Sequence, residues 1–283
     1  MASLSVVRLT LVAVLAASLA GFSCSNAPAP PQQGTPAFYW AAARETYAAG
    51  DYAKTAEHLE QISSGDSEIG ARARPWLLIL TSGAAAGYMS LADAFEAGAR
   101  ARQSESASFR RQTNNFRAAA NRNALVFAET FEKFQKAGQP MVPLAFSFPT
   151  GSAGPVAGLG KVANGVAPAP GELATLEKRA LERAILLSAC RAAGAPEDAA
   201  RAQEVFKASD PQVARATFVM AMADSLHEQA QLYGRTKLDD PGKLKIFSTR
   251  ALAALDGLPE SKQTKELRAK VSGSLKSIQV AGR

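Results

Sequence analysis

Cysteine and histidine supply most nucleophilic and metal-binding side chains, and this chain of 283 residues has only two of each. Cys190 lies among Leu and Ala in a helical pattern, which predicts a buried and unreactive thiol. His58 and His227 are far apart in the sequence and each has a Glu beside it, which is typical of a helix surface. We therefore expect no metal site and no catalytic Cys or His.

The motifs of common enzyme classes are missing as well. HExxH, CxxC, GxSxG and GxGxxG do not occur in the sequence. The segment 154–161 resembles a phosphate-binding loop superficially, but Pro155 replaces its first glycine and Val162 replaces the Ser or Thr after the lysine. The paired acids Asp239 and Asp240 are typical of a helix cap. We expect a protein that is not an enzyme, with no catalytic residues and no cofactor.

Residues 1–23 are predicted to be a secretory signal peptide. They contain one base, Arg8, and no acid, and the apolar run 9–20 follows. This run is shorter than the about 20 residues that span a bilayer, and small residues come after it, as at a signal cleavage site. Two cleavage positions are open. One lies after Ala20, and the other lies before Cys24, where the segment GFSC resembles a bacterial lipobox and implies that Cys24 is lipidated.

The residues after Cys24 fit a lipid-anchored protein. The segment 24–36 is Pro-rich and uncharged, so we expect an extended tether, in which the twelve residues 25–36 reach roughly 37 Å at roughly 3.1 Å per residue. No Asp follows Cys24 at the second position, a pattern that resembles outer-membrane sorting. We expect an exported, lipid-anchored protein of the bacterial cell envelope that faces the periplasm, with a soluble periplasmic protein as the alternative. The net charge of +7 does not indicate nucleic acid binding, because we expect the chain to be exported and it has no recognition motif.

From residue 37 onward, strong helix formers dominate and strand signals are nearly absent, so we expect an all-α fold. The pattern predicts an N-terminal helical half over 37–137 and a C-terminal half over 172–283. In the first half the expected helices are 37–49, 52–62, 68–102 and 104–137, the last as one long helix or a kinked pair. In the second half they are 172–193, 199–208, one from Asp210-Pro211 to about 233, one from Asp240-Pro241, and one from Leu258-Pro259 to about 279.

The first helix pair resembles a tetratricopeptide repeat. The stretch YWAAARETYAAGDYAKTAEHLEQI has an aromatic start, small residues midway and a Gly-Asp-Tyr turn. Gly50 suits a tight turn because it adopts positive φ at low cost, and the small Ala43 lets the helices approach. The chain departs from the family at Thr55 and Ile62. The resemblance implies antiparallel hairpins that stack as a right-handed solenoid or bundle, since one hairpin cannot bury its own face.

Two features stand out in the long helices. Gly83 and Gly87, four residues apart among alanines, predict close helix packing, and Phe residues at helical spacings within 104–137 predict a core-facing stripe. Basic residues gather in the same region against Glu105 alone: Arg100, Arg102, Arg110, Arg111, Arg117 and Arg122. Two interpretations of this cluster are open, a solvated helix face and a patch that faces an anionic partner.

The segment 138–171 interrupts the helices, because its six prolines forbid a continuous helix. It is nevertheless apolar, with side chains that need burial: Met141, Val142, Leu144, Phe146 and Phe148. We expect this Pro/Gly-rich segment to fold into a groove between the two helical halves. A mobile lid and a partner-docking loop are the alternatives.

These features favour a non-catalytic, envelope-anchored helical scaffold that binds another envelope protein. Stacked helix hairpins form surfaces that commonly hold peptides or domains. The residues expected to contact the partner are Tyr39, Tyr47, Arg110, Arg111 and Arg117. The sequence does not indicate an oligomeric state.

A second expectation is a small-molecule-binding lipoprotein. The chain has a lipobox, a tetratricopeptide-like pair, a long helix with Tyr88 and Phe95, and then an Arg-bearing helix. This order resembles the T-component lipoproteins of TRAP-type transporters. The resemblance implies an apolar cavity lined by Tyr88 and Phe95, whereas a solid core there favours the scaffold.

Overall fold

The structure, a computed structural model, describes residues 31–281 except 66 and 197, with side chains up to residue 276. The expected signal peptide, Cys24 and most of the tether lie outside the described residues. Two units divide the chain, residues 1–32 and 33–283. Among the described residues the second unit is built of helices, with one two-stranded sheet. The all-α prediction is confirmed.

The first helix pair consists of α2 (Pro36–Ala49) and α3 (Tyr52–Ser63). Gly50 makes the turn between them with φ of +79°, as the sequence predicted. Thr55, where the chain departs from the repeat family, is buried. Its hydroxyl lies 3.1 Å from the hydroxyl of Thr46, so the two helices are joined by a polar contact as well as by apolar packing.

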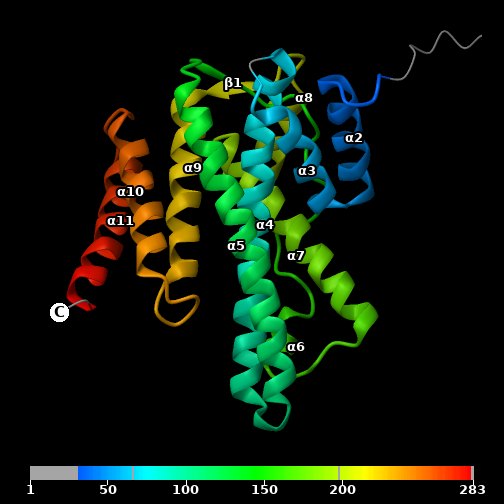
Figure 1. The fold of residues 1–283 in the computed structure, drawn as a ribbon, viewed down its shortest axis with the longest axis vertical. Helices are drawn as coiled ribbons and strands as arrows, with labels where there is room; N and C mark the ends of the chain where they lie inside the picture. The colour runs from blue at the N-terminus through cyan, green and yellow to red at the C-terminus, as the bar shows by residue number, and fades with distance from the viewer. Residues whose placement is uncertain (1–30, 66, 197, 282–283) are drawn as a thin grey trace, which may run out of the picture. The chain divides into compact units, whose positions relative to one another are not determined.

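Helix α4 (Glu68–Ala101) is central, and it contacts α3, α7 (Pro170–Ala192), α9 (Arg215–Ala230) and α5 (Ser106–Lys136) (Figure 1). Within the described part of the chain, α4 alone is long and apolar enough to cross a membrane. However, 72% of its most apolar window is buried inside the protein, as in the core helix of a soluble protein.

Close packing of α4 on α7 depends on glycine, as predicted. A Cβ at Gly83 would lie 2.5 Å from the Cα of Ile185, and a Cβ at Gly87 would lie 3.1 Å from the carbonyl oxygen of Ala180. The backbones of these helices therefore approach more closely than any larger residue allows. The two predicted halves share one compact unit through this contact.

Helix α5 is continuous, and the short 3₁₀ turn η1 (Gln103–Glu105) joins it to α4. The predicted Phe stripe is buried along its length: Phe109, Phe116, Phe127, Phe131 and Phe134. The opposite face of α5 is polar and exposed.

The connecting segment packs onto the helices, which is in accord with the first of its three predicted roles. Val142 and Leu144 are buried, and the Phe146 ring lies 5.1 Å from Trp40 and 4.9 Å from Trp76. The segment also contains the short helix α6 (Leu159–Ala163).

The same segment forms a strand that the sequence analysis missed. Strand β1 (Met141–Pro143) pairs antiparallel with β2 (Gln212–Ala214), with Val142 opposite Val213. The prediction that a helix starts at Asp210-Pro211 is therefore wrong, because residues 212–214 are held in the sheet and α9 begins only at Arg215.

The C-terminal part has short connections. Asp240 caps the following helix by accepting a 2.9 Å hydrogen bond from the backbone N–H of Lys243, as predicted. The last helix begins at Lys262 rather than at Leu258-Pro259, because Ser261 accepts the backbone N–H of Thr264 and acts as its cap. The remaining elements are α8 (Ala199–Lys207), η2 (Gln231–Tyr233), α10 (Pro241–Asp256) and α11 (Lys262–Ala281).

Candidate functional site

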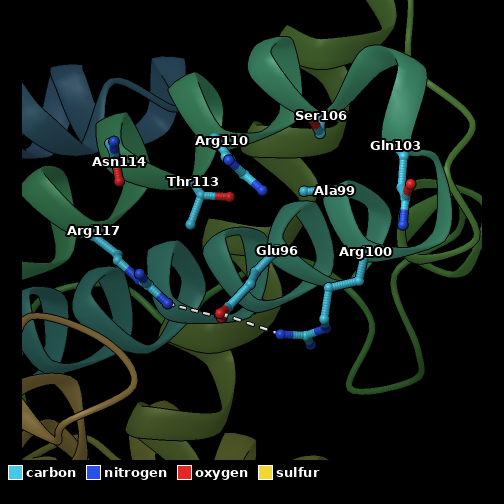
Figure 2. A pocket seen from close by; sticks show the side chains of 9 residues that line it. All are labelled: Glu96, Ala99, Arg100, Gln103, Ser106, Arg110, Thr113, Asn114 and Arg117. Atoms are coloured by element: carbon cyan, nitrogen blue, oxygen red, sulfur yellow. Dashed lines mark hydrogen bonds and ion pairs between the residues drawn. The ribbon is translucent and has the colours of Figure 1, made fainter.

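The C-terminal part of α4 and the N-terminal part of α5 enclose an open hollow of about 840 Å³, here called the α4–α5 hollow (Figure 2). It forms because the turn η1 folds α5 back along α4, while Phe95, Phe109 and Phe116 hold the two helices together on the buried side. The lining is mainly polar: Glu96, Ala99, Arg100, Gln103, Ser106, Arg110, Thr113, Asn114 and Arg117.

The charge of this hollow is unbalanced. Its lining has three guanidinium groups and one carboxylate. Both oxygens of Glu96 are occupied, Oε1 at 3.2 Å from Arg100 Nη1 and Oε2 at 2.7 Å from Arg117 Nη2. The lining therefore keeps a net positive charge even after these ion pairs form.

Arg117 is predominantly a structural residue. Its side chain is only 11% exposed, and besides Glu96 it donates to the carbonyl oxygens of Thr236 and Lys237 at 3.2 and 3.4 Å. It thereby fastens the loop before α10 to both long helices. These contacts fit a structural role for Arg117 better than the predicted partner-binding role.

Arg110 differs from Arg117 because it is exposed and has no hydrogen-bonding or ionic partner among the described residues. Figure 2 shows its side chain projecting from α5 toward the α4 side of the hollow. The side chains of Gln103, Ser106 and Asn114 also make no hydrogen bond within the described part of the chain, although they line the same space. The hollow thus offers a free cation and three free polar groups, which is the chemistry that oxyanions require.

A second hollow, of about 380 Å³, adjoins the first and is here called the α5–α10 hollow. Its lining is Asn114, Arg117, Ala118, Asn121, Tyr233, Lys237, Leu238, Asp240 and Lys243. Both of its lysines are paired, Lys237 with Asp93 at 2.9 Å and Lys243 with Asp240 at 3.2 Å. The sequence analysis missed it because the loop at 234–240 reaches α5 only in the folded chain.

The other predicted partner residues lie elsewhere. Arg111 is exposed on α5 but does not line either hollow. Tyr39 packs beside His58, with ring centroids 6.1 Å apart. Tyr47 packs against Trp76, with ring centroids 6.0 Å apart, and burial, then the neighbouring Tyr52, raises the pKa of its phenol.

The two tyrosines and the arginines are therefore not part of one site. Trp76, which Tyr47 contacts, precedes Glu96 by about 30 Å along α4 at about 1.5 Å per residue. The fold brings Arg110 and Arg117 together with Glu96, which the sequence analysis did not include. The sequence does contain one signal for Glu96: it lies four residues before Arg100, on the same helix face.

The side chains implied by the TRAP-type resemblance do not meet in a cavity. Phe95 is buried in a solid cluster, with its ring 5.6 Å from Phe109 and 5.5 Å from Phe116. Tyr88 donates a 3.1 Å hydrogen bond to Glu177 and lines a smaller hollow of about 210 Å³ whose lining does not include Phe95. This packing favours the scaffold over the small-molecule binder.

The environment of Cys190 agrees with the sequence-based prediction, whereas that of His227 agrees only in part. Cys190 is buried, and burial raises the pKa of its thiol, so the predicted unreactive thiol is in accord with the structure. His227 is half-buried, its Nδ1 has no partner among the described residues, and burial lowers its pKa. Among the residues that the structure describes, no group of three or more His, Cys, Asp or Glu could hold a metal.

The structure is that of an all-α protein with a basic hollow, rich in hydrogen-bond donors, between two long helices. No protein-family model, no curated protein and no solved structure matches the chain. The residues of the hollow are thus the basis on which a function can be proposed.

Proposed function

We propose that this chain is a non-catalytic, lipid-anchored envelope protein that binds an acidic partner protein at the α4–α5 hollow. The observation that supports it is the free Arg110 in a lining of three guanidinium groups and one carboxylate. Complementary charge speeds the encounter of two proteins and disfavours wrong partners. The partner is expected to be another protein of the cell envelope.

The helical architecture supports a scaffold. The pair α2–α3 keeps the Gly50 turn of a tetratricopeptide-like hairpin, and α4–α5 and α9–α10 follow as further pairs that contact each other. We propose a tetratricopeptide-like stack of antiparallel hairpins for this arrangement. Such stacks present extended surfaces to protein ligands.

The composition of the hollow supports a binding role rather than catalysis. Its one carboxylate, Glu96, is held by two arginines, and its lining has no His, Cys or Lys. A general acid–base mechanism needs a group that can gain and lose a proton near the working pH.

The anchor places this site in the envelope. Cys24 follows the proposed signal peptide 1–23, and residues 24–36 act as the spacer between the bilayer and the helices. An acyl anchor with two or more chains suffices for stable membrane attachment. Metabolic palmitate is expected to label the wild type but not Cys24→Ala, and label retained in Cys24→Ala would contradict the anchor.

Charge reversal tests the binding site. Affinity purification from solubilised envelopes is compared between the wild type and the double variant Arg110→Glu, Arg111→Glu. The matched control is Arg44→Glu, Arg179→Glu, because both of these arginines are exposed and outside the two hollows. We expect the first double variant to lose an acidic protein that the wild type and the control retain, and the retained binding to weaken as salt is raised.

Equal recovery of that protein by the wild type and both double variants would contradict the proposal. Circular dichroism of each variant checks that the helices are intact. Since the side chains of Arg110 and Arg111 are exposed and make no hydrogen bond or ion pair within the described residues, the fold is expected to be unchanged.

A further inference from the structure

The two hollows are continuous. Asn114 and Arg117 line both of them. Together with Arg110 and Asn121 they recur every three or four residues, so they lie on one face of α5. Residues 110 and 121 are separated by about 16 Å along the helix, at about 1.5 Å per residue. The two hollows therefore form one trough along α5.

The chemistry of this trough changes from one end to the other. At the Arg110 end a free guanidinium is accompanied by free polar side chains. At the other end both lysines are already paired with acids, and Leu238 has 36% of its surface exposed. This end offers an apolar surface and the amide of Asn121, but no unpaired charge among the described lining residues.

Amide side chains occupy the middle and the far end of the trough. Asn114 makes no hydrogen bond within the described part of the chain, and Asn121 uses its Oδ1 to accept the Tyr233 hydroxyl at 2.9 Å. An amide has both donors and an acceptor, which match the N–H and C=O groups of an extended peptide backbone. A free inorganic anion would not use the amide side chains and the Leu238 surface together. The same holds for a polyanion that has no amide groups of its own.

From this gradient we infer that the trough binds an extended peptide segment with an acidic residue at one end and an apolar residue about five positions away. The inference rests on the proposed function and specifies its partner. An extended chain rises about 3.3 Å per residue, so about five residues span the 16 Å between the ends. The acidic side chain pairs with Arg110, and the apolar side chain packs on Leu238.

Contacts within the chain fix one wall of the trough. Arg117 ties Thr236 and Lys237 to α5 and to Glu96, and Lys237 is further paired with Asp93. These contacts fix the loop that presents Leu238. A binding surface that is already ordered loses less entropy when a peptide binds.

The test uses two fluorescently labelled peptides, Asp-Asp-Ser-Gly-Ser-Leu and Asp-Asp-Ser-Gly-Ser-Ser, each in both chain directions. Their dissociation constants for the full chain are measured by fluorescence anisotropy. In one of the two directions, the wild type is expected to bind the Leu peptide about tenfold more tightly than the Ser peptide, because a Leu side chain leaves water. Leu238→Ser is expected to remove this preference. The control Leu125→Ser, at a Leu exposed to 41% and outside the trough, is expected to keep it.

The outcomes separate this inference from the proposed function. Equal binding of the Leu and Ser peptides in both directions, a preference that survives Leu238→Ser, or binding of none of the peptides would overturn the inference. Arg110→Gln is expected to weaken the Leu and Ser peptides by the same factor. If Arg110→Gln has no effect on either, the proposed acidic site is wrong, whatever Leu238→Ser does.

Discussion

The indole Nε1–H of Trp76 in α4 donates a 3.0 Å hydrogen bond to the backbone carbonyl oxygen of Leu144, 68 residues further along the chain. Both residues are buried. This bond satisfies the buried indole N–H and fixes the connecting segment against α4, while the same carbonyl oxygen also accepts the backbone N–H of Phe146 at 2.9 Å.

Removing that donor tests how firmly the segment is held. In Trp76→Phe the buried ring becomes smaller, and the Leu144 carbonyl oxygen keeps only its hydrogen bond from the backbone N–H of Phe146, so we expect the free energy of unfolding to fall by about 1–3 kcal/mol. Urea denaturation followed by circular dichroism measures this. Ser147→Ala, at an exposed position of the same segment, is expected to change stability by no more than about 0.5 kcal/mol. Amide exchange at solvent rates across 141–148 in the wild type would contradict the packed arrangement.

The contact between α4 and α7 predicts a strong effect of a single methyl group. A Cβ at position 83 would overlap the backbone of α7 at Ile185, so Gly83→Ala is expected to cost about 1–3 kcal/mol. The matched control is Gly273→Ala in α11, where a Cβ meets nothing within 4 Å. There the better helix propensity of Ala is expected to stabilise by up to about 1 kcal/mol. The prediction fails if thermal melting shows both variants shifted in the same direction.

Because Arg117 acts as a clamp, substitutions of Arg117 and Arg111 in the same helix are expected to change the free energy of unfolding by very different amounts. Arg117→Gln removes a charge-assisted bond to Glu96 and the bonds to two carbonyl oxygens, so we expect a loss of about 1.5–3 kcal/mol. Arg111→Gln, at an exposed position without a partner among the described residues, is expected to stay within about 0.5 kcal/mol of the wild type. Similar urea midpoints for the two variants would show that Arg117 is not a clamp.

Two half-buried phenols predict a loss of stability in alkali. Burial, then Glu182, raises the pKa of Tyr52 to about 12, and burial, then Glu177, raises that of Tyr88 to about 12. Because the folded pKa lies above the ordinary value of about 10, the stabilisation is complete below pH about 10 and is lost as pH rises toward about 12. We expect urea midpoints to fall over this range, with part of the fall removed in Tyr88→Phe. A near-ultraviolet titration in which Tyr88→Phe is identical to the wild type above pH about 11 would contradict the assignment.

Local signals predicted the helices well, because caps and turns act within a few residues. Gly50 and Asp240 are examples, since each ends or starts a helix through its own backbone or side chain. The pairing of Val142 with Val213 could not be predicted in this way, because a three-residue strand depends on a partner far along the chain. The same limit explains why Asp210-Pro211 resembles a helix start in the sequence although strand β2 follows it.

The site was predicted to a smaller extent. The cluster of arginines pointed to α5, and Arg110 does line a hollow. Glu96 was missed because it lies on the preceding helix and meets Arg117 only after the turn at η1. Tyr47 was chosen as an aromatic contact residue, yet its ring packs against Trp76 and Phe146. Composition identifies a charged region, whereas only the packed structure separates the paired charges from the free ones.

The antiparallel pairing of β1 with β2 predicts what happens when the backbone is cut between the two strands. Residues 150–155 are exposed, and they lie between the two strands in the sequence. A protease that cuts there separates the chain into two polypeptides, one with α2–α5 and β1, the other with α6–α11 and β2. Since the strand pair and the α4–α7 glycine contact both bridge the cut, the two pieces should stay associated and co-migrate under native conditions, and two separately expressed fragments should reassemble.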